Sequence, residues 1–369
     1  RCGKTQSQQL EQIRSAMTAT GKFHARIIMN CSPGYNAQVE ENLISKSAIK
    51  WCRTALNLTA EQSMQLTALR VEASHRSFYR VESPTRSDTL VLMLSPPALE
   101  NNDQFLRLAT VFGNHHLPVP QVFSTNLTSG FFLMQDLGSQ HLQELYGTAA
   151  ETPALTAAIE TLVQLSTVDD PAIPPYTAER LTTELGLFDE WFVQKFLQQQ
   201  LDEATFRGIC SQLVDSAEQQ PESCVHRDYH CRNLLYQNGH LGIVDFQDAL
   251  HGPVLYDIAS LLRDCYHTFD EAKIEQWLHQ FIDLTPALNT LPYTQVKQWF
   301  DYMAIQRQLK AIGIFARLHL RDHKSSHLSE IGPLLQRLLD LTAQYSELED
   351  LNAQLKQVHT WAQAHSELF

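Results

Sequence analysis

The sequence predicts an α+β fold with a small β-rich N-terminal part and a larger, mainly helical C-terminal part. Up to Gly138, short apolar segments follow the order strand, strand, strand, helix, strand, strand. Beyond Gly138 the chain consists mostly of long amphipathic segments rich in Leu, Ala and Gln. One strand-like island, residues 233–245, interrupts these helices.

The N-terminal elements follow residues 1–40, which lack strong periodicity and are expected to form a poorly ordered extension. Apolar residues then recur at helical spacing over 41–58. The Ser83-Pro84-Thr85 triplet predicts a hairpin turn between two of the strands that follow. In chain order, the remaining segments are predicted as strands 66–70, 78–81 and 89–94, helix 105–112, and strands 121–124 and 131–136.

The C-terminal elements are mainly helices, and the island among them reads as a β-hairpin. Residues 234–236 and 241–244 flank an Asn238-Gly239 pair, which favours a two-residue turn. The predicted helices cover 156–168, 182–200, 204–217, 272–284, 294–320 and 331–358.

The composition limits the classes of partner. Lys and Arg total 28 against 41 Asp and Glu, and the net charge of -13 disfavours nucleic acid and anionic membranes as partners. The seven cysteines are odd in number and form no CxxC pair, which argues against a disulfide framework and a zinc knuckle. With no apolar run long enough to span a bilayer, these features predict a cytoplasmic protein.

Two polar clusters stand at the ends of the hairpin. The run from His226 to Asn233 precedes it, and Asp245-Phe246-Gln247-Asp248 follows it. Because a hairpin returns the chain beside its start, Asn233 and Asp245 are expected to face one site, which Asp228 approaches from the preceding loop. A carboxylate for the acceptor alcohol and two oxygen ligands for Mg²⁺ are what phosphoryl transfer needs. The alternative is that Asp and Asn only cap loops of a helical protein.

The motifs resemble those of known kinases. His226-Arg-Asp, with Asn233 five residues after the Asp and Val244-Asp-Phe beyond the hairpin, resembles the catalytic and metal-binding loops of protein kinases. The sequence lacks Ala-Pro-Glu and leaves no room for a long activation segment before Tyr256, so it is closer to the aminoglycoside phosphotransferase family. Within that family, residues 43–345 resemble the bacterial anomeric kinases of N-acetylmuramate and N-acetylglucosamine, which serve cell-wall recycling.

This resemblance implies a protein-kinase-like bilobal fold that uses ATP and Mg²⁺ to phosphorylate a small-molecule hydroxyl. A nucleotide-binding N-lobe would span 41–137, and a C-lobe for catalysis and substrate binding would span 138–369. Asp228 would orient the acceptor hydroxyl and accept its proton, while Asn233 and Asp245 would hold magnesium.

Other residues of the two clusters receive roles from the same resemblance. His230 would lie near the γ-phosphate, or else pack the site as an ordinary loop histidine. Arg232 would support the loop or contact substrate. His226 and Asp257 would be structural, with Asp257 tying its helix to the catalytic loop.

The sequence departs from the family pattern in the N-terminal part. The loop 73–80 contains no glycine, so Ser74 and Arg76 are the candidates for contacts to the ATP phosphates. Met93 stands where kinases place a phosphate-pairing Lys, which leaves a non-catalytic nucleotide-binding protein as an alternative. Backbone groups near Gln135 and Leu137 would bind adenine.

The expected acceptor is an amino sugar. Arg307 and Arg317 of the helix at 294–320 suit a lactyl carboxylate or neutral hydroxyls better than polycationic antibiotics, unless they are simply solvated. Gln247 and Asp248 are candidates for binding sugar hydroxyls, although Gln247 is equally suited to packing. An aminoglycoside or another small alcohol remains the alternative acceptor.

Overall fold

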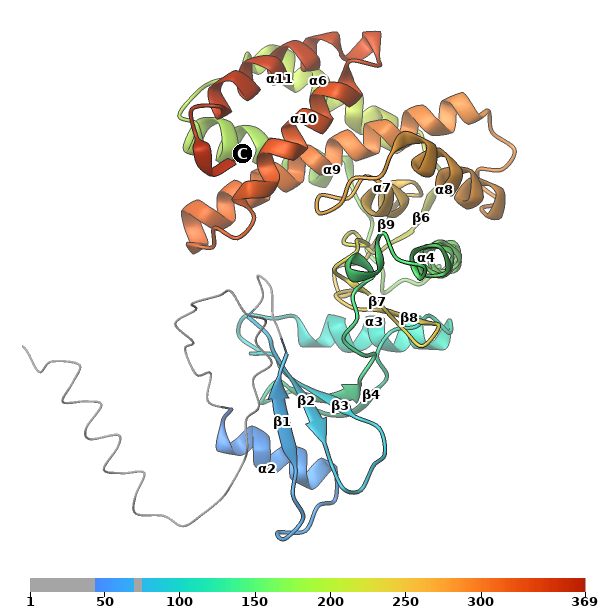
Figure 1. Cartoon of the computed structure of the whole chain (residues 1–369), viewed down its shortest axis with the longest axis vertical. Coiled ribbons are helices and arrows are strands. Elements are labelled where there is room, and N and C mark those ends of the chain that lie inside the picture. Colours follow the sequence, from blue (N-terminus) through green and yellow to red (C-terminus); the bar gives the residue numbers. More distant parts are fainter. Residues whose placement is uncertain (1–43, 70–74, 369) are drawn as a thin grey trace, which may run out of the picture. The chain divides into compact units, whose positions relative to one another are not determined.

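The computed structural model describes residues 44–69 and 75–368 (Figure 1). Their contacts form two compact units. The first unit holds the described residues up to Glu100 together with Phe123–Asp136, and the second holds Asn101–Val122 and the described residues from Leu137 onward. The predicted extension 1–40 and the candidate Ser74 lie outside the described residues.

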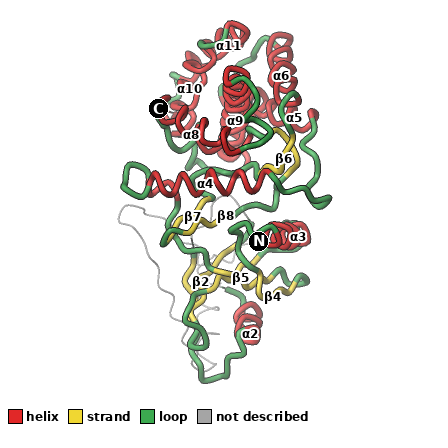
Figure 2. Tube along the Cα trace, turned by 90° about the vertical axis from the view of Figure 1, so that its right-hand side faces the viewer, coloured by secondary structure: helices red, strands yellow, loops and turns green. Residues whose placement is uncertain are grey.

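The first unit is a five-stranded sheet in the order β1-β2-β3-β5-β4, with one helix beside it (Figures 1 and 2). Its apolar core joins Cys52 and Leu56 of that helix to strand residues such as Val81 and Leu92. Strands β1, β2, β3 and β5 pair antiparallel. The elements are α2 (Lys46–Ala55), β1 (Gln65–Ala68), β2 (Ser77–Glu82), β3 (Leu90–Leu94), β4 (Val122–Asn126) and β5 (Phe131–Gln135).

Helix α3 (Asn102–Asn114) groups with the second unit, although it falls within the predicted N-lobe range. The ring of Phe105 stacks on Phe246 with centroids 5.2 Å apart, and Phe112 meets the same ring edge-on at 5.8 Å. After the helix, the carbonyl of Pro118 accepts a hydrogen bond from the Ile243 N–H at 2.8 Å. Helix α3 is therefore attached to the segment that carries Asp245.

The second unit is mainly helical, as the sequence predicts. The helices are α4 (Glu151–Ser166), α5 (Ala178–Leu187), α6 (Glu203–Glu218), α7 (Tyr256–Leu262), α8 (Glu271–Leu284), α9 (Tyr293–Asp322), α10 (Ile331–Thr342) and α11 (Glu349–Ala362). Short 3₁₀ turns occur at Leu142–Leu145, Leu328–Glu330, Ser346–Leu348 and Ser366–Leu368. Helix α9 packs against α5, α6, α7 and α10 and forms the centre of this unit (Figures 1 and 2).

Two of the predicted long helices are interrupted. The segment 182–200 is α5 followed by a π-helix, Phe188–Phe196, where α9 comes very close. A Cβ added at Gly313 of α9 would lie 2.4 Å from the Leu187 carbonyl, so only glycine fits there. The segment 331–358 is two helices, α10 and α11, because the chain turns at Tyr345, whose hydroxyl donates to Asp301 at 2.6 Å.

The hairpin of the island forms as predicted, from β7 (Leu234–Gln237) and β8 (His240–Ile243). Asn238 and Gly239 both have positive φ, 54° and 82°, as a type I′ turn requires. A second pair, β6 (Glu222–Val225) with β9 (Leu250–Pro253), was not predicted from the sequence. Its register places Val225 opposite Leu250, so both polar clusters lie between two strand pairs.

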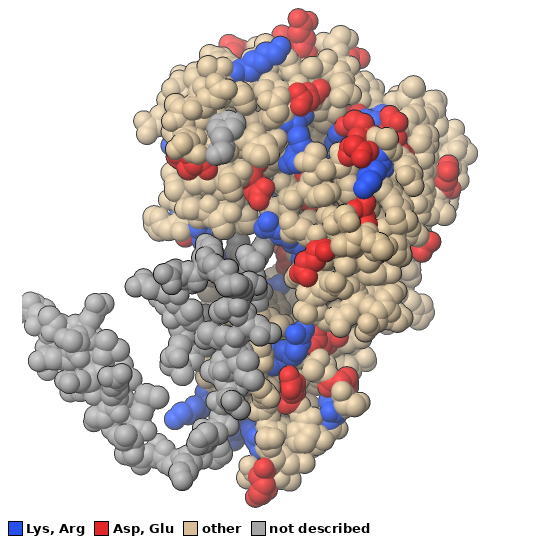
Figure 3. Space-filling view, viewed as in Figure 1, with Lys and Arg blue, Asp and Glu red and all other residues tan. Residues whose placement is uncertain are grey.

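The surface charge is mixed on the face shown in Figure 3, where acidic and basic side chains are interspersed. Among the described residues, no helix is long and apolar enough to cross a membrane.

Candidate active site

Asp257 of α7 holds the backbone of the loop that carries Asp228. This fully buried carboxylate accepts the backbone N–H of His226 and, at 2.9 Å, the backbone N–H of Arg227. Burial raises the pKa of Asp257 to about 7, although those two N–H groups oppose the shift. Asp257 therefore connects its helix to the loop, as the family resemblance implies.

The ring of His226 joins the two polar clusters. Its Nε2 lies 3.1 Å from the carbonyl oxygen of Val244, and its Nδ1 accepts the Asp228 N–H at 3.3 Å. Burial lowers the pKa of His226 to about 4, so the ring is neutral at physiological pH, with the proton on Nε2. The catalytic loop and the strand before Asp245 are thereby fixed to each other.

Asn233 lies between Asp228 and Asp245. Its side-chain nitrogen donates to the Asp228 carbonyl at 3.0 Å, which leaves the amide oxygen as the donor atom for a cation. The Val244 N–H donates to the Asn233 carbonyl at 3.1 Å, so the β7–β8 ladder continues up to the residue before Asp245. Gln247 donates to the Asp245 carboxylate at 2.7 Å.

This donor set fits magnesium. Asn233 offers an amide oxygen and the exposed Asp245 a carboxylate, and Mg²⁺ prefers such hard ligands, completed by water and phosphate oxygens. Within the described ranges, no cluster of three or more His, Cys, Asp or Glu offers a denser cage. A nucleotide-linked ion is therefore the type of metal that these residues suit.

The backbone is left-handed at two positions of this site. Arg227 has φ 77° and Asp245 has φ 66°, a region that costs a non-glycine residue roughly 1–2 kcal/mol. The Arg227 N–H is held by Asp257, while the Asp245 side chain is held by Gln247. Strained backbone of this kind is commonly found where side chains must be aimed for function.

The carboxylate of Asp228 stands among cations. Within the described part of the chain, no side chain lies within hydrogen-bond or ion-pair distance of it. Burial raises the pKa of Asp228, but Lys310, His230 and Arg227 outweigh that effect and bring it below its ordinary value of 3.8. Asp228 is therefore ionised at neutral pH and available to an acceptor hydroxyl.

A buried network around Glu184 of α5 holds the neighbours of Asp228. The Glu184 carboxylate lies 2.6 Å from Arg227 and 3.0 Å from Lys310, and it accepts the hydroxyl of Tyr176. Lys310 also donates to the Tyr256 hydroxyl at 3.0 Å. Burial alone raises the pKa of Glu184, but Lys310 and Arg227 bring it below the ordinary value. The network holds the side chains of Arg227 and Lys310 next to Asp228.

The predicted substrate residues fall into two groups. Arg307 lies beside the catalytic loop, where it donates to the Arg227 carbonyl at 3.3 Å. Gln247 and Asp248 follow Asp245, with the Asp248 carbonyl accepting from Arg227 at 3.3 Å. Arg317 lies ten residues along α9 from Arg307, about 15 Å further along the axis. The structure does not bring it together with Asp228.

The residues around His230 form a polar and aromatic cluster. The ring of Tyr266 meets His230 edge-on, with centroids 5.4 Å apart, and the Arg232 guanidinium lies 3.5 Å from the Tyr266 centroid. Arg232 also donates to Gln143 at 3.2 Å and lies 3.8 Å from Glu330. These contacts fit the loop-supporting role predicted for Arg232.

The nucleotide candidates of the first unit are already engaged with their neighbours. Arg76 is 5% exposed, pairs with Glu100 at 3.3 Å and donates to Ser95 at 3.2 Å. Met93 is fully buried opposite Phe78, so its side chain belongs to the core of the sheet. The phosphate contact predicted for Arg76 stays a prediction.

The two predicted adenine contacts lie on either side of the unit boundary. Gln135 ends β5 opposite Leu90 in the first unit. Leu137 belongs to the second unit, where it packs on Gly242 of β8 so closely that an added Cβ would meet it at 3.0 Å.

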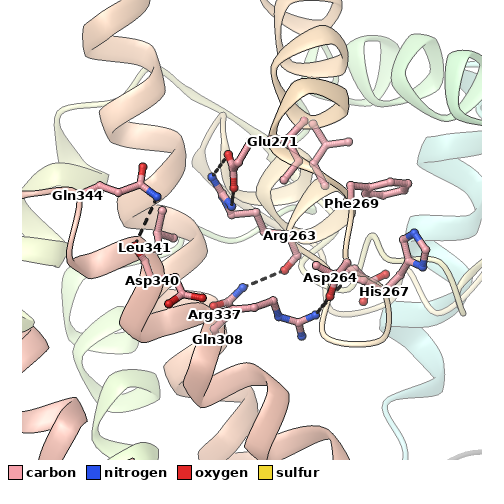
Figure 4. Close-up of a pocket in the computed structure, with 13 residues that line it drawn as sticks. Arg263, Asp264, His267, Phe269, Glu271, Gln308, Arg337, Asp340, Leu341 and Gln344 are labelled. Carbon is pink, nitrogen blue, oxygen red and sulfur yellow. Dashed lines mark hydrogen bonds and ion pairs between the residues drawn. The ribbon is translucent and has the colours of Figure 1, made fainter.

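A cavity of about 160 Å³ opens between α8, α9 and α10 (Figure 4). Among its lining residues, Arg263 pairs with Glu271 at 2.8 Å, and Arg337 donates to the Cys265 carbonyl at 3.2 Å. Asp264 accepts the backbone N–H of Cys231 at 3.0 Å and so supports the catalytic loop. None of the residues predicted for the site lines this cavity.

Glu184 and Asp264 also belong to the surroundings of the site, although neither was predicted from the sequence. Glu184 shares a helical face with Leu181, Leu185 and Phe188, and a charged residue among buried apolar ones is a detectable signal. Asp264 follows α7 and has no comparable signal in the sequence. It accepts backbone N–H groups, and any residue type except proline can supply such a group.

The β-sheet unit, the helical unit and the loop that brings Asp228 and Asn233 close to Asp245 are typical of a phosphotransferase of the kinase type. Comparison with known proteins identifies the family. Residues 65–291 match the model of the phosphotransferase enzyme family, and the chain belongs to that family. It is therefore an ATP-dependent phosphotransferase that acts on a hydroxyl-bearing substrate.

Its sequence relatives include two bacterial kinases. The N-acetylmuramate/N-acetylglucosamine kinase of Neisseria meningitidis serogroup B is 35% identical over 311 residues, covering 80% of this chain and 91% of that protein. The kinase of the same name from Pseudomonas aeruginosa is 32% identical over 305 residues, covering 79% of this chain and 88% of that protein.

Solved structures share the fold at low identity. An ethanolamine kinase of Plasmodium vivax aligns with a TM-score of 0.57 at 11% identity, over 91% of this chain and 95% of that one. The ADP-bound aminoglycoside phosphotransferase APH(2'')-Ib aligns with a TM-score of 0.55 at 13% identity, over 81% and 99%. The predicted protein-kinase-like fold is confirmed.

Proposed function

We propose that the protein transfers the γ-phosphoryl group of ATP to the anomeric hydroxyl of N-acetylmuramate or N-acetylglucosamine. The main support is the similarity, over about four-fifths of the chain, to kinases named for these sugars. The ionised Asp228, open to an acceptor, supports the chemistry. Phosphorylation of recovered amino sugars would serve cell-wall recycling.

The catalytic loop performs the proton step. The Asp228 carboxylate orients the acceptor hydroxyl and takes its proton as the oxygen attacks the γ-phosphorus. The bond from the γ-phosphorus to the bridging oxygen breaks, and ADP leaves. Lys310 and Arg227 keep Asp228 ionised, and Asp257 holds the loop backbone.

Asn233 and Asp245 would hold magnesium, which neutralises triphosphate charge when bound. Asn233 is oriented for this by its bond to the Asp228 carbonyl, and Asp245 by Gln247. Adenine would be bound near Gln135 and Leu137, with phosphate contacts from Ser74, Arg76 and His230. Gln247 and Asp248 would bind sugar hydroxyls, and Arg232 would support the loop through its contacts with Gln143 and Tyr266.

The test is ADP release with N-acetylmuramate, N-acetylglucosamine and an aminoglycoside. The wild type is expected to turn over both sugars, and Asp228→Ala is expected to lose at least about a hundredfold in kcat. The matched control is Asp283→Ala, an exposed Asp on α8, which is expected to keep full activity. Turnover of the aminoglycoside alone would overturn the sugar assignment, and equal rates for wild type and Asp228→Ala would overturn the mechanism.

A further inference from the structure

One of the cations around Asp228 makes no ion pair with a carboxylate of the described residues. Three cations, Arg227, Arg307 and Lys310, lower the pKa of Asp228 together with His230. Glu184 forms ion pairs with Arg227 and Lys310. Within residues 44–69 and 75–368, no carboxylate lies within 4 Å of Arg307. The site therefore holds one guanidinium without an ion-pair partner.

Arg307 is fixed in place rather than freely mobile. It donates to the Arg227 carbonyl at 3.3 Å, and its guanidinium carbon lies 4.8 Å from the ring centroid of Tyr256. Tyr256 is itself fully buried and hydrogen-bonded to Lys310. The Nε of Arg307 is buried and makes no hydrogen bond to a described residue. A planar guanidinium held in this way is ready for a bidentate contact with a carboxylate or phosphate.

Its neighbours indicate which anion it would meet. The carboxylates that act most strongly on Arg307 are Asp228, which would receive the acceptor, and Asp257 of α7, which holds the backbone of the same loop. Magnesium, with Asn233 and Asp245, would neutralise the phosphates from the hairpin side. An anion beside Arg307 is therefore more naturally a part of the acceptor than of the nucleotide.

We propose that Arg307 binds a carboxylate of the acceptor, and that this contact favours the acidic amino sugar over the neutral one. In N-acetylmuramate this group is the lactyl carboxylate, which N-acetylglucosamine lacks. The inference rests on the proposed function, because both sugars are taken from it. A charge-assisted bidentate contact is about twice as strong as a neutral one, so its loss is expected to lower kcat/KM roughly tenfold to a hundredfold.

The experiment compares wild type, Arg307→Gln and Arg307→Lys on both sugars in parallel. Arg307→Gln is expected to lose roughly tenfold to a hundredfold in kcat/KM for N-acetylmuramate, mainly through KM, and less than about threefold for N-acetylglucosamine. Arg307→Lys keeps the charge but not the fork and is expected to fall between. The matched control is Arg321→Gln, an exposed arginine of the same helix, which is expected to change neither value.

The outcomes separate this inference from the proposed function. An equal loss on both sugars would mean that Arg307 serves the phosphoryl step or supports the loop, and it would overturn the carboxylate role. If Arg307→Gln has a lowered thermal midpoint, the kinetics of Arg307→Lys decide between the two roles, because lysine retains a donor for the Arg227 carbonyl. An unchanged sugar preference in Arg307→Lys would then overturn the proposal. Wild-type protein inactive on both sugars would instead overturn the proposed function.

Discussion

Two buried carboxylates of the second unit have matching partners but different surroundings. Each accepts one largely buried arginine, one lysine and one tyrosine hydroxyl. The partners are Arg227, Lys310 and Tyr176 for Glu184, and Arg263, Lys297 and Tyr345 for Asp301. Glu184 also lies 3.8 Å from the exposed Arg180. Arg227 lies next to Asp228, the proposed base, whereas Arg263 follows α7 and lines the cavity of Figure 4.

The comparison teaches that burial and ion pairing alone do not identify a functional residue. Asp301 joins α7 and α9 to the segment before α11, which is a task of assembly. Glu184 does the same for α5 and α9, but one of its partners also belongs to the catalytic loop. Removing the carboxylate charge of Glu184 should therefore lower both stability and catalysis, whereas removing that of Asp301 should lower stability alone.

The largest effect is expected for Glu184→Gln. Removing one partner of a buried ion pair costs about 3–5 kcal/mol, because the remaining charges are left buried. Arg227 and Lys310 also lose their anchor beside Asp228, so kcat is expected to fall by at least about tenfold in the protein that remains folded. Thermal unfolding and initial rates measure the two losses separately. A variant that is destabilised but fully active would remove the functional distinction between the two carboxylates.

Asp301→Asn is expected to cost about 3 kcal/mol of stability, near the low end for a broken buried pair. The loss is limited because Arg263 keeps its contacts with Glu271, at 2.8 and 3.0 Å. The rate per folded molecule, measured well below the thermal midpoint, should match that of the wild type. A fall in kcat comparable with that of Glu184→Gln would show that the two networks are not functionally distinct.

Lys310→Met tests the electrostatic part of the comparison. Without this cation, the pKa of Asp228 should rise, since Lys310 is the strongest of the charges that lower it. The acidic limb of the kcat/KM profile is then expected to move to higher pH, so the loss of rate relative to the wild type grows as the pH falls. Lys297→Met, the corresponding lysine of the Asp301 network, is the control and should leave the limb in place. An unmoved limb in Lys310→Met would contradict the role assigned to its charge.

The smallest effects are expected for the tyrosine hydroxyls. Tyr345→Phe and Tyr176→Phe each remove one hydrogen bond to a charged group, which costs about 1.5 kcal/mol of stability. Tyr345→Phe should leave the kinetics unchanged, and thermal midpoints of both variants measure the losses. A fall in kcat for Tyr345→Phe that equals or exceeds the fall for Tyr176→Phe would contradict the distinction between the two networks.

Much of the fold could be predicted from sequence because its signals are local. The Asn238-Gly239 turn, the strand order and the amphipathic segments each depend on neighbouring residues. The break between α10 and α11 could not be predicted, because Tyr345 is fixed by Asp301, a residue distant in the sequence. The π-helix after α5 likewise follows from the approach of Gly313 on α9.

The candidate site divides in the same way. That Asp228, Asn233 and Asp245 lie close together could be predicted, because the motif and the hairpin fall within one short segment. Glu184 lies far upstream, and its link to Arg227 exists only in three dimensions. Arg307 and Arg317 are alike in residue type and share a helix, so only the position along α9 distinguishes them.

The left-handed backbone at Arg227 limits which substitutions this position can accept during evolution. A glycine there would relieve the backbone cost but would remove the guanidinium that Glu184 and the Asp248 carbonyl engage. Relatives that carry glycine at this position should therefore also have lost the acidic residue on the equivalent of α5. Positions 184 and 227 are expected to change together, as one inherited pair, in an alignment of the family.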